Sequence, residues 1–224
     1  MSDTRGTLLP VYVLVDESHS MRRHIAELNR GLADLHEALL GEPMAAAKVR
    51  FSILGFADDV KQRMRLADLR REDQLPTLAA RGRTNYTKAF ADLRRRLPRD
   101  VRALKDEGYA VHRPAVFVLT DGQPSDDGWQ EEHARLVDHG VTPEAPNIIA
   151  CGIGSAHPAT ILRVATRPEF AFVALAGIDI GVAIAQFCSA LTRSIIASAP
   201  SRTAGPSRLV VHPPAGFSMA IDVV

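Results

Sequence analysis

The stretch that decides the fold is 8–20, LLPVYVLVDESHS, in which an apolar run stops abruptly at Asp16. An unbroken apolar run of strand length is typical of a strand buried on both faces, and therefore of a parallel sheet covered by helices. The stretch 114–122, PAVFVLTDG, has the same form and ends at Asp121. The sequence therefore predicts two central strands, each with a carboxylate at its carboxyl end.

Strands and helices are expected to alternate along the rest of the chain. Between Ser20 and Gly41 the apolar residues recur at steps of three and four, which predicts a helix. We expect further strands at 49–56, 60–66 (an edge strand), 147–153 and 170–175. Further helices are expected at 86–97 (ended by Pro98, after which Val101 and Leu104 begin another short helical piece), 126–139, 158–165 and 178–198. This alternation predicts an α/β fold: a doubly wound, mostly parallel sheet with one antiparallel edge strand and helices on both faces.

The length and composition suit one folded domain followed by a tail. Of 224 residues, 46% are apolar and 24% charged, which excludes a disordered chain, a disulfide scaffold and a collagen-like polymer. We expect residues 1–198 to form the domain. The remainder, 199–224, begins with a linker rich in Pro, Gly and Ser at 199–208, and then forms either a tail or one extra strand around 209–212.

Compartment is inferred from the apolar segments. No stretch approaches the ~20 uninterrupted apolar residues that span a bilayer, and the first ten residues lack the apolar core of a secretory signal. Cys151 and Cys188 lie in apolar segments and are expected to be buried thiols. We therefore expect a cytoplasmic protein that does not associate with a membrane.

Five oxygen-bearing side chains are expected to meet at the carboxyl edge of the sheet, where ligand sites of such folds lie. Asp16, Ser18 and Ser20 follow the first strand, Asp121 follows the central strand, and Thr84 precedes a helix. Hydroxyl and carboxylate oxygens suit Mg²⁺ or Mn²⁺, whereas thiolates or several imidazoles would indicate Zn²⁺. If most ligands are neutral hydroxyls, the cation keeps much of its charge and an open position for a carboxylate from another molecule.

Plainer roles for these residues remain open. Asp16, Ser20 and Thr84 can cap helices, and Asp121 can complete a turn. Two further expectations concern their acidic neighbours. Glu17 is expected to face solvent. The pair at 126–127 is expected to cap the helix that contains Trp129, with the alternative that it lines the mouth of the site.

The pattern Asp16-x-Ser18-x-Ser20, then Thr84, then Thr120-Asp121-Gly122, resembles the metal-ion-dependent adhesion site (MIDAS) of the von Willebrand factor A domain. The segments LPVYVLVDESHSM, VFVLTDGQPSDDGW and NIIACGIGS are similar to the bacterial tellurium-resistance branch of that family, the TerY-like proteins. The resemblance covers roughly residues 8–198. It implies a Rossmann-like fold in which the two serines bind the cation directly, the threonine and Asp121 bind directly or through water, and Asp16 holds waters and the serines.

The function that these features predict is non-enzymatic: a bound Mg²⁺ or Mn²⁺ grips a carboxylate of a protein partner. The resemblance to TerY-like proteins further implies a tellurite or stress-response system, with phosphorylation-signalling proteins among the partners. Two residues depart from the family, which usually has Gly at both positions. His19 is expected to reshape the loop, and Arg83 to place a cation beside the site that repels the metal or helps to hold an incoming carboxylate.

The alternative is a metal-dependent hydrolase acting on a phosphorylated substrate. A dehalogenase-type phosphatase needs Asp-x-Asp after its first strand, but Ser18 occupies the second position, and the sequence has neither a P-loop nor a Gly-x-Ser-x-Gly elbow.

The charge distribution raises nucleic-acid binding as a third class of function. Residues 61–105 carry 14 basic and 5 acidic side chains, which makes them a candidate surface for an acidic partner. The arginines at 94–102 lack interleaved aromatic residues for base stacking, which argues against nucleic acid.

Overall fold

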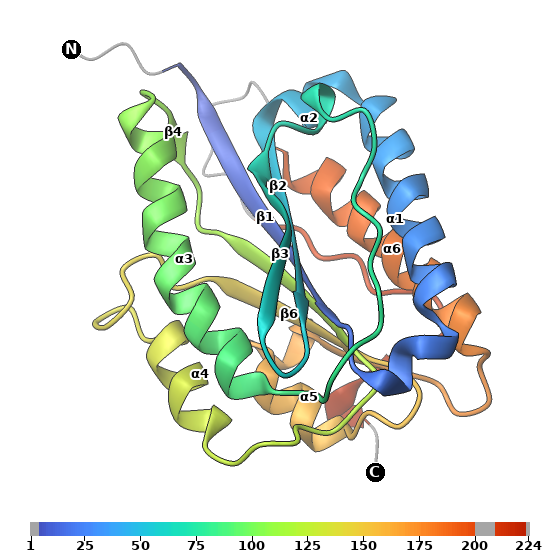
Figure 1. Ribbon diagram of the computed structural model, residues 1–224. Helices are drawn as coiled ribbons and strands as arrows, with labels where there is room; N and C mark the ends of the chain where they lie inside the picture. Colours follow the sequence, from blue (N-terminus) through green and yellow to red (C-terminus); the bar gives the residue numbers. More distant parts are fainter. Residues whose placement is uncertain (1–4, 200–208, 223–224) are drawn as a thin grey trace.

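In the computed structural model, which describes residues 5–199 and 209–222, one mixed sheet runs through the centre of the molecule with helices on both faces (Figure 1). The described strands are β1 Thr7–Asp16, β2 Val49–Phe56, β3 Val60–Ala67, β4 Ala110–Val111, β5 Ala115–Thr120, β6 Asn147–Gly152, β7 Ala171–Ala174 and β8 Phe217–Met219. Their order is β3-β2-β1-β5-β6-β7-β8, and β4 pairs with the start of β1. The predicted fold class is confirmed, except that both β3 and β8 are antiparallel edge strands where the sequence predicted one.

The strand order reverses at β1. This strand pairs in parallel with β2 on one side and with β5 on the other, so that Val13 lies opposite both Ile53 and Phe117. From β1 the chain moves outward to β2 and β3, then crosses back to β5 and continues outward through β6 and β7. The carboxyl ends of β1 and β5 therefore flank the point where a doubly wound sheet binds ligands.

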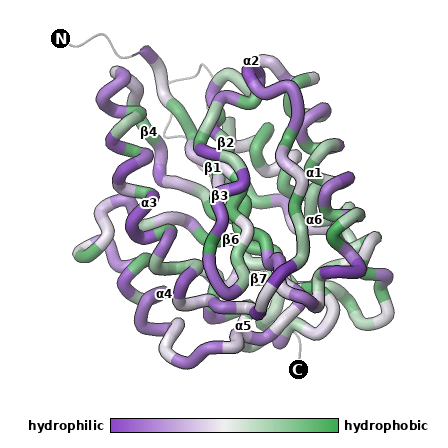
Figure 2. Tube along the Cα trace, viewed as in Figure 1, coloured by the Kyte–Doolittle hydropathy of each residue, from purple (hydrophilic) through white to green (hydrophobic). Residues whose placement is uncertain are grey.

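The described α-helices cover both faces of the sheet. They are α1 Ile25–Leu40, α2 Pro43–Lys48, α3 Tyr86–Asp106, α4 Trp129–Val137, α5 Pro158–Val164 and α6 Ile180–Ser198. On one face α1 packs against α6, and on the other α3 packs against α4 (Figure 1). Figure 2 shows hydrophobic residues concentrated in the central strands, and a mixture of hydrophilic and hydrophobic residues along α3.

The contact between α1 and α6 depends on a glycine. A Cβ atom on Gly31 would lie 2.7 Å from Sγ of Cys188, so any larger residue would push the two helices apart. Cys188 and Cys151 are both free and buried, as predicted. Of the described helices, α6 has the length and composition of a membrane span, but half of it is buried in the fold, including Phe187 and Leu191.

The helix expected to end at Pro98 instead continues to Asp106 as one helix, α3. Leu97, Val101 and Leu104 are all buried along the same face, which one uninterrupted helix keeps turned towards the core. A proline inside a helix costs about 3 kcal/mol, whereas burying one such side chain contributes about 1.5–3 kcal/mol. The burial beyond Pro98 therefore outweighs the lost backbone hydrogen bond.

The extra strand at the carboxyl end lies further along the chain than predicted. Phe217–Met219 form β8 against β7, whereas 209–212 form no strand. The backbone of this earlier segment is satisfied by α6 side chains instead: the Ser198 hydroxyl bonds both N–H and C=O of Val210, at 2.8 and 3.1 Å. Most of the expected linker, 200–208, lies outside the described residues.

Candidate metal site

The structure brings the five predicted oxygen-bearing side chains together at the carboxyl ends of β1 and β5. Ser18 Oγ lies 2.8 Å from Ser20 Oγ, and Ser20 Oγ donates to Asp121 Oδ1 at 2.8 Å. On the other side of the cluster, Thr84 Oγ1 donates to Asp16 Oδ2 at 3.4 Å. Four of the five side chains are buried and Ser20 is exposed, so the cluster opens to solvent at Ser20.

The spacing of these oxygens fits a small octahedral cation. Mg²⁺ binds oxygen at about 2.1 Å, which places neighbouring ligand oxygens about 3 Å apart. The two 2.8 Å separations through Ser20 match that edge length. Among the described residues no group of three or more His, Cys, Asp and Glu side chains forms a metal cluster. The donors here are three hydroxyls and two carboxylates, a set that suits a hard cation.

Asp16 is held from several directions although it is fully buried. Its Oδ1 accepts from the backbone N–H of Ser18 at 2.8 Å, and its Oδ2 accepts from Thr120 Oγ1 at 2.6 Å. Burial raises the pKa of the Asp16 carboxyl group, and these hydrogen bonds act in the opposite direction. Thr120 belongs to the predicted Thr-Asp-Gly motif but was not predicted as a site residue. Its position at the end of β5 is the signal that places it beside Asp16.

Asp121 is also buried, and burial raises the pKa of its carboxyl group. The hydrogen bond from Ser20 and the nearby His24 favour its ionised form. A divalent cation at these oxygens would stabilise the ionised forms of both Asp16 and Asp121. The hydrogen bonds and charges of the protein therefore offset only part of the cost of burying the Asp16 and Asp121 carboxylates, and a bound cation would offset the rest.

Thr84 is free to face the cluster because another residue caps the helix that follows it. Asn85 Oδ1 accepts from the backbone N–H of Lys88 at 2.8 Å, which makes Asn85 the N-cap of α3.

Asp126 also binds the start of α3, accepting from the N–H groups of Tyr86 and Thr87. The expectation that Asp126 caps the helix containing Trp129 is therefore wrong; α4 begins after Gly128.

The prediction that Glu17 faces solvent is wrong, because its side chain is fully buried. Glu17 follows the last residue of β1, and its carboxylate lies beside Gly55 of β2. Its carboxylate accepts from Arg63 Nε and Nη2 at 2.8 and 2.9 Å, and from Arg81 Nε at 2.8 Å. A Cβ on Gly55 would lie 2.2 Å from Glu17 Cδ, so the carboxylate occupies the space that a side chain at Gly55 would need.

The two residues that depart from the family pattern are both exposed at this edge. His19 fits without a left-handed backbone, because every described residue with positive φ is a glycine. Its N–H donates to the carbonyl of Gly82 at 3.1 Å, which ties the first loop to the segment that carries Thr84. Arg83 uses its backbone N–H to bind Asp58 Oδ1 at 3.1 Å, and its side chain is solvent-exposed.

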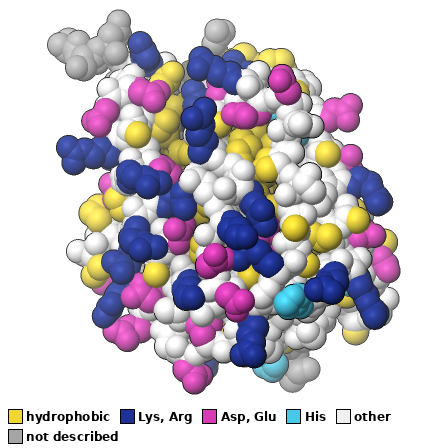
Figure 3. All heavy atoms as spheres, in the orientation of Figure 1, with side chains coloured by type: hydrophobic (Ala, Val, Ile, Leu, Met, Phe, Trp, Pro, Cys, Tyr) yellow, Lys and Arg dark blue, Asp and Glu magenta, His cyan; other side chains and the backbone are white. Residues whose placement is uncertain are grey.

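The basic stretch of the sequence is partly neutralised in the fold. Arg94 pairs with Glu132 of α4 at 3.2 Å, and the buried Arg96 pairs with Asp92 at 2.8 Å. Figure 3 shows Lys and Arg side chains interspersed with Asp and Glu over this face of the molecule. The arginines of α3 therefore belong to a surface of mixed positive and negative charge, and they do not form a continuous cationic patch on this face.

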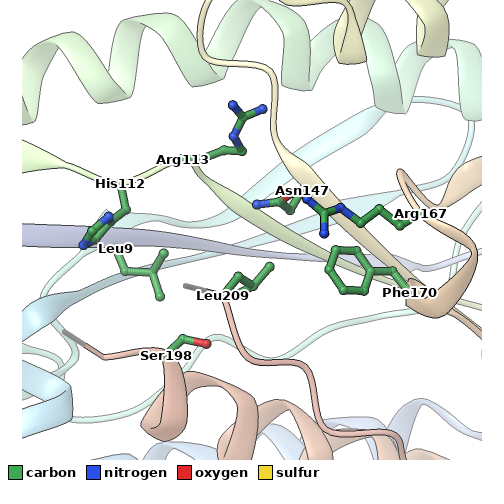
Figure 4. Close-up of a pocket in the computed structure, with 8 residues that line it drawn as sticks. All are labelled: Leu9, His112, Arg113, Asn147, Arg167, Phe170, Ser198 and Leu209. Atoms are coloured by element: carbon green, nitrogen blue, oxygen red, sulfur yellow. The ribbon is translucent and has the colours of Figure 1, made fainter. Parts of the chain in front are cut away.

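A cavity of about 260 Å³ lies at the opposite end of the central strands from the oxygen cluster, near the amino ends of β1, β5 and β6 (Figure 4). In Figure 4 the side chain of Arg167 extends towards Asn147, with Phe170 beside it. The residues that line it are Leu9, His112, Arg113, Asn147, Arg167, Phe170, Ser198 and Leu209. None belongs to the oxygen cluster, so the candidate metal site and this cavity are separate features.

With this geometry established, comparison with known proteins identifies the family. Residues 11–177 match the profile of the von Willebrand factor type A domain, and the chain belongs to that family. A search of curated proteins finds no match to the sequence.

Solved structures share the fold at low sequence identity. Proximal thread matrix protein 1 from the mussel byssus, whose structure has a zinc-occupied MIDAS motif, is 17% identical with a TM-score of 0.61; the match covers 84% of this chain and 48% of that one. The pilus adhesin SpaC from Lactobacillus rhamnosus GG is 12% identical with a TM-score of 0.67, over 86% of this chain and 30% of that one. A von Willebrand factor type A protein from Catenulispora acidiphila is 13% identical with a TM-score of 0.55, over 85% of this chain and 43% of that one. This chain thus spans about half the length, or less, of each.

Proposed function

We propose that this chain is a divalent-cation-dependent protein-binding module. In this proposal Asp16, Ser18, Ser20, Thr84 and Asp121 hold one Mg²⁺ or Mn²⁺, and the cation binds a carboxylate of a partner protein. The observation that carries the proposal is the chain of 2.8 Å contacts through Ser18, Ser20 and Asp121 at the switch point of the sheet. Hydroxyl ligands leave the cation under-neutralised, which favours an anionic ligand from outside.

Exposed basic side chains at the rim support an acidic partner. Arg83 is exposed and lies next to Thr84 in the sequence, and His19 is exposed between Ser18 and Ser20. A cationic side chain beside the open position would attract and orient a carboxylate, and would raise the association rate at low salt. The departure at Arg83 is therefore compatible with partner binding.

The biological setting that we propose rests on the segments quoted from the sequence. Their similarity to TerY-like proteins supports a role in a bacterial tellurite or stress-response system, with phosphorylation-signalling proteins as partners. The same similarity supports a cytoplasmic location.

Carboxylate binding by the cation can be tested with acetate as the probe. With Mn²⁺ bound to the protein, the carboxyl ¹³C of acetate should relax faster, because a coordinated carboxylate lies next to a paramagnetic ion. Acetamide, which is of similar size but neutral, is the matched control. Its carbonyl ¹³C relaxation rate should differ little between samples with and without the Mn²⁺-loaded protein. Equal relaxation of acetate and acetamide would show that the cation does not accept a carboxylate.

The hydrolase alternative makes an opposite prediction. A metal-dependent phosphatase would turn over p-nitrophenyl phosphate in the presence of Mn²⁺. We expect no turnover above that of the Asp121→Ala variant. Turnover that needs both Mn²⁺ and Asp121 would replace the binding proposal with the hydrolase.

A further inference from the structure

Glu17, Arg63 and Arg81 form an ion network around a buried carboxylate, next in the chain to Asp16 of the candidate metal site. Glu17 follows Asp16 in the chain and is fully buried. Arg63 and Arg81 approach its carboxylate from different segments and share it between them, with N···O distances of 2.8–2.9 Å. A buried carboxylate that is bound by two arginines is fixed in position as well as neutralised.

The two arginines differ in what they hold. Arg63 projects from β3, whose position is already set by antiparallel pairing with β2. Arg81 belongs to the irregular segment between β3 and α3, which continues through Gly82 and Arg83 to Thr84. Of the two arginines, therefore, only Arg81 restrains the segment that supplies the threonine of the metal site.

Arg81 is anchored through both its backbone and its side chain. Its N–H donates to the carbonyl of Glu17 at 2.5 Å, and its Nη2 donates to the carbonyl of Gly55 at 2.9 Å. Its guanidinium also pairs with Asp59 in the turn between β2 and β3. These contacts fix Arg81 against the ends of both β1 and β2.

The residue after Arg81 shows how tightly the segment is packed. Gly82 has φ +55°, and a Cβ there would lie 2.3 Å from Asp58 Oδ2. Its carbonyl accepts the N–H of His19 at 3.1 Å. The segment therefore passes in close contact between the loop of Ser18 and Ser20 and the β2–β3 turn before it reaches Thr84.

We propose that Arg81, anchored on Glu17, is a positioning residue for the metal site. It holds the Thr84 hydroxyl against Asp16 Oδ2 without itself contacting the cation. This inference rests on the proposed cation-binding function and adds a residue that the family motif does not contain. Without the anchor, the segment keeps its backbone contacts but gains freedom at Arg81, and the loss of that freedom when the cation binds would reduce the affinity.

The test compares the two arms of the same carboxylate. In calorimetric titrations with Mn²⁺, at a temperature where circular dichroism shows all variants folded, Arg81→Gln should weaken binding about tenfold. Arg63→Gln also removes one arm of the network, but it should change the affinity by less than about twofold, because it restrains only a paired strand. Equal losses in the two variants would show that the network acts through charge or stability alone, and would overturn the proposal.

A double variant tests whether Arg81 acts through Thr84. In a Thr84→Ala background, Arg81→Gln should weaken Mn²⁺ binding by no more than about twofold further. A full additional loss in that background would mean that Arg81 acts by another route, and would also overturn the proposal.

Amide hydrogen exchange of the metal-free protein gives a readout that does not depend on the cation. The N–H of His19 bonds to Gly82 O and that of Asn85 bonds to Ala57 O, so both report on this segment. Arg81→Gln should speed exchange at both amides, and Arg63→Gln should not. If the wild type binds no Mn²⁺, the proposed function fails while exchange still decides the positioning role: unchanged rates in Arg81→Gln would refute it.

Discussion

Replacing Thr120 by Val removes the shortest hydrogen bond to Asp16 while keeping the shape of the side chain. Thr120 Oγ1 donates to Asp16 Oδ2 at 2.6 Å, and both side chains are fully buried, so water cannot replace the lost donor. A hydrogen bond to a charged group contributes about 1.5–3 kcal/mol to stability. Thr120→Val should lower the free energy of unfolding by at least that amount, because it also removes the acceptor of the Gly122 N–H at 3.2 Å.

The assay is urea unfolding at neutral pH, supported by thermal unfolding. In a chain of this size each kcal/mol shifts the melting temperature by about 2–4 °C, so we expect a fall of about 3–12 °C. Thr192→Val is the matched control, because Thr192 is also a buried hydroxyl but donates to a neutral carbonyl, that of Cys188, at 2.9 Å. It should cost only about 0.5–1.5 kcal/mol. If the two variants lose the same stability, Asp16 is not held as a buried carboxylate and the electrostatic account of the site is wrong.

Three further predictions concern stability. Burial lowers the pKa of His133, so the unfolded chain takes up the proton first and stability is lost as pH falls below about 6.5; His133→Gln should flatten urea midpoints measured from pH 7 to pH 5, and an unchanged slope would contradict this. Pro98→Ala restores a helical N–H in α3 and should raise the free energy of unfolding by about 1–3 kcal/mol, whereas a loss would mean that the proline is needed there. Gly55→Ala places a methyl group against the buried Glu17 carboxylate and should cost at least about 3 kcal/mol in the same assay, and a cost below 1 kcal/mol would show that the network can move.

The sequence predicts the main sheet well because apolar runs of strand length carry a strong signal. The ends of those runs also place Asp16 and Asp121 at the same edge, and the spacing Asp-x-Ser-x-Ser brings in both serines. Thr84 could be added from its place before a helix. These predictions rely on local patterns, and the structure brings the five side chains together as the strand order requires.

What the sequence did not reveal depends on distant contacts. The environment of Glu17 is set by arginines 46 and 64 residues away, and no local pattern indicates that they meet. Asp126 lies just before one helix but binds the start of another, about 40 residues earlier. Pro98 carries a local signal for a helix end, which the burial of Val101 and Leu104 overrides.

The central claim is that the five oxygens bind one divalent cation, and calorimetric titration with Mn²⁺ tests it most directly. Ser20 is exposed, so Ser20→Ala should leave the fold intact, and Ser189→Ala, at an exposed position on α6, is its control. The account predicts a single site in the wild type, weakened at least about tenfold (~1.4 kcal/mol) in Ser20→Ala and in Asp121→Ala, and unchanged in Ser189→Ala. Absence of binding at millimolar Mn²⁺, or equal affinity in all four proteins, would contradict it.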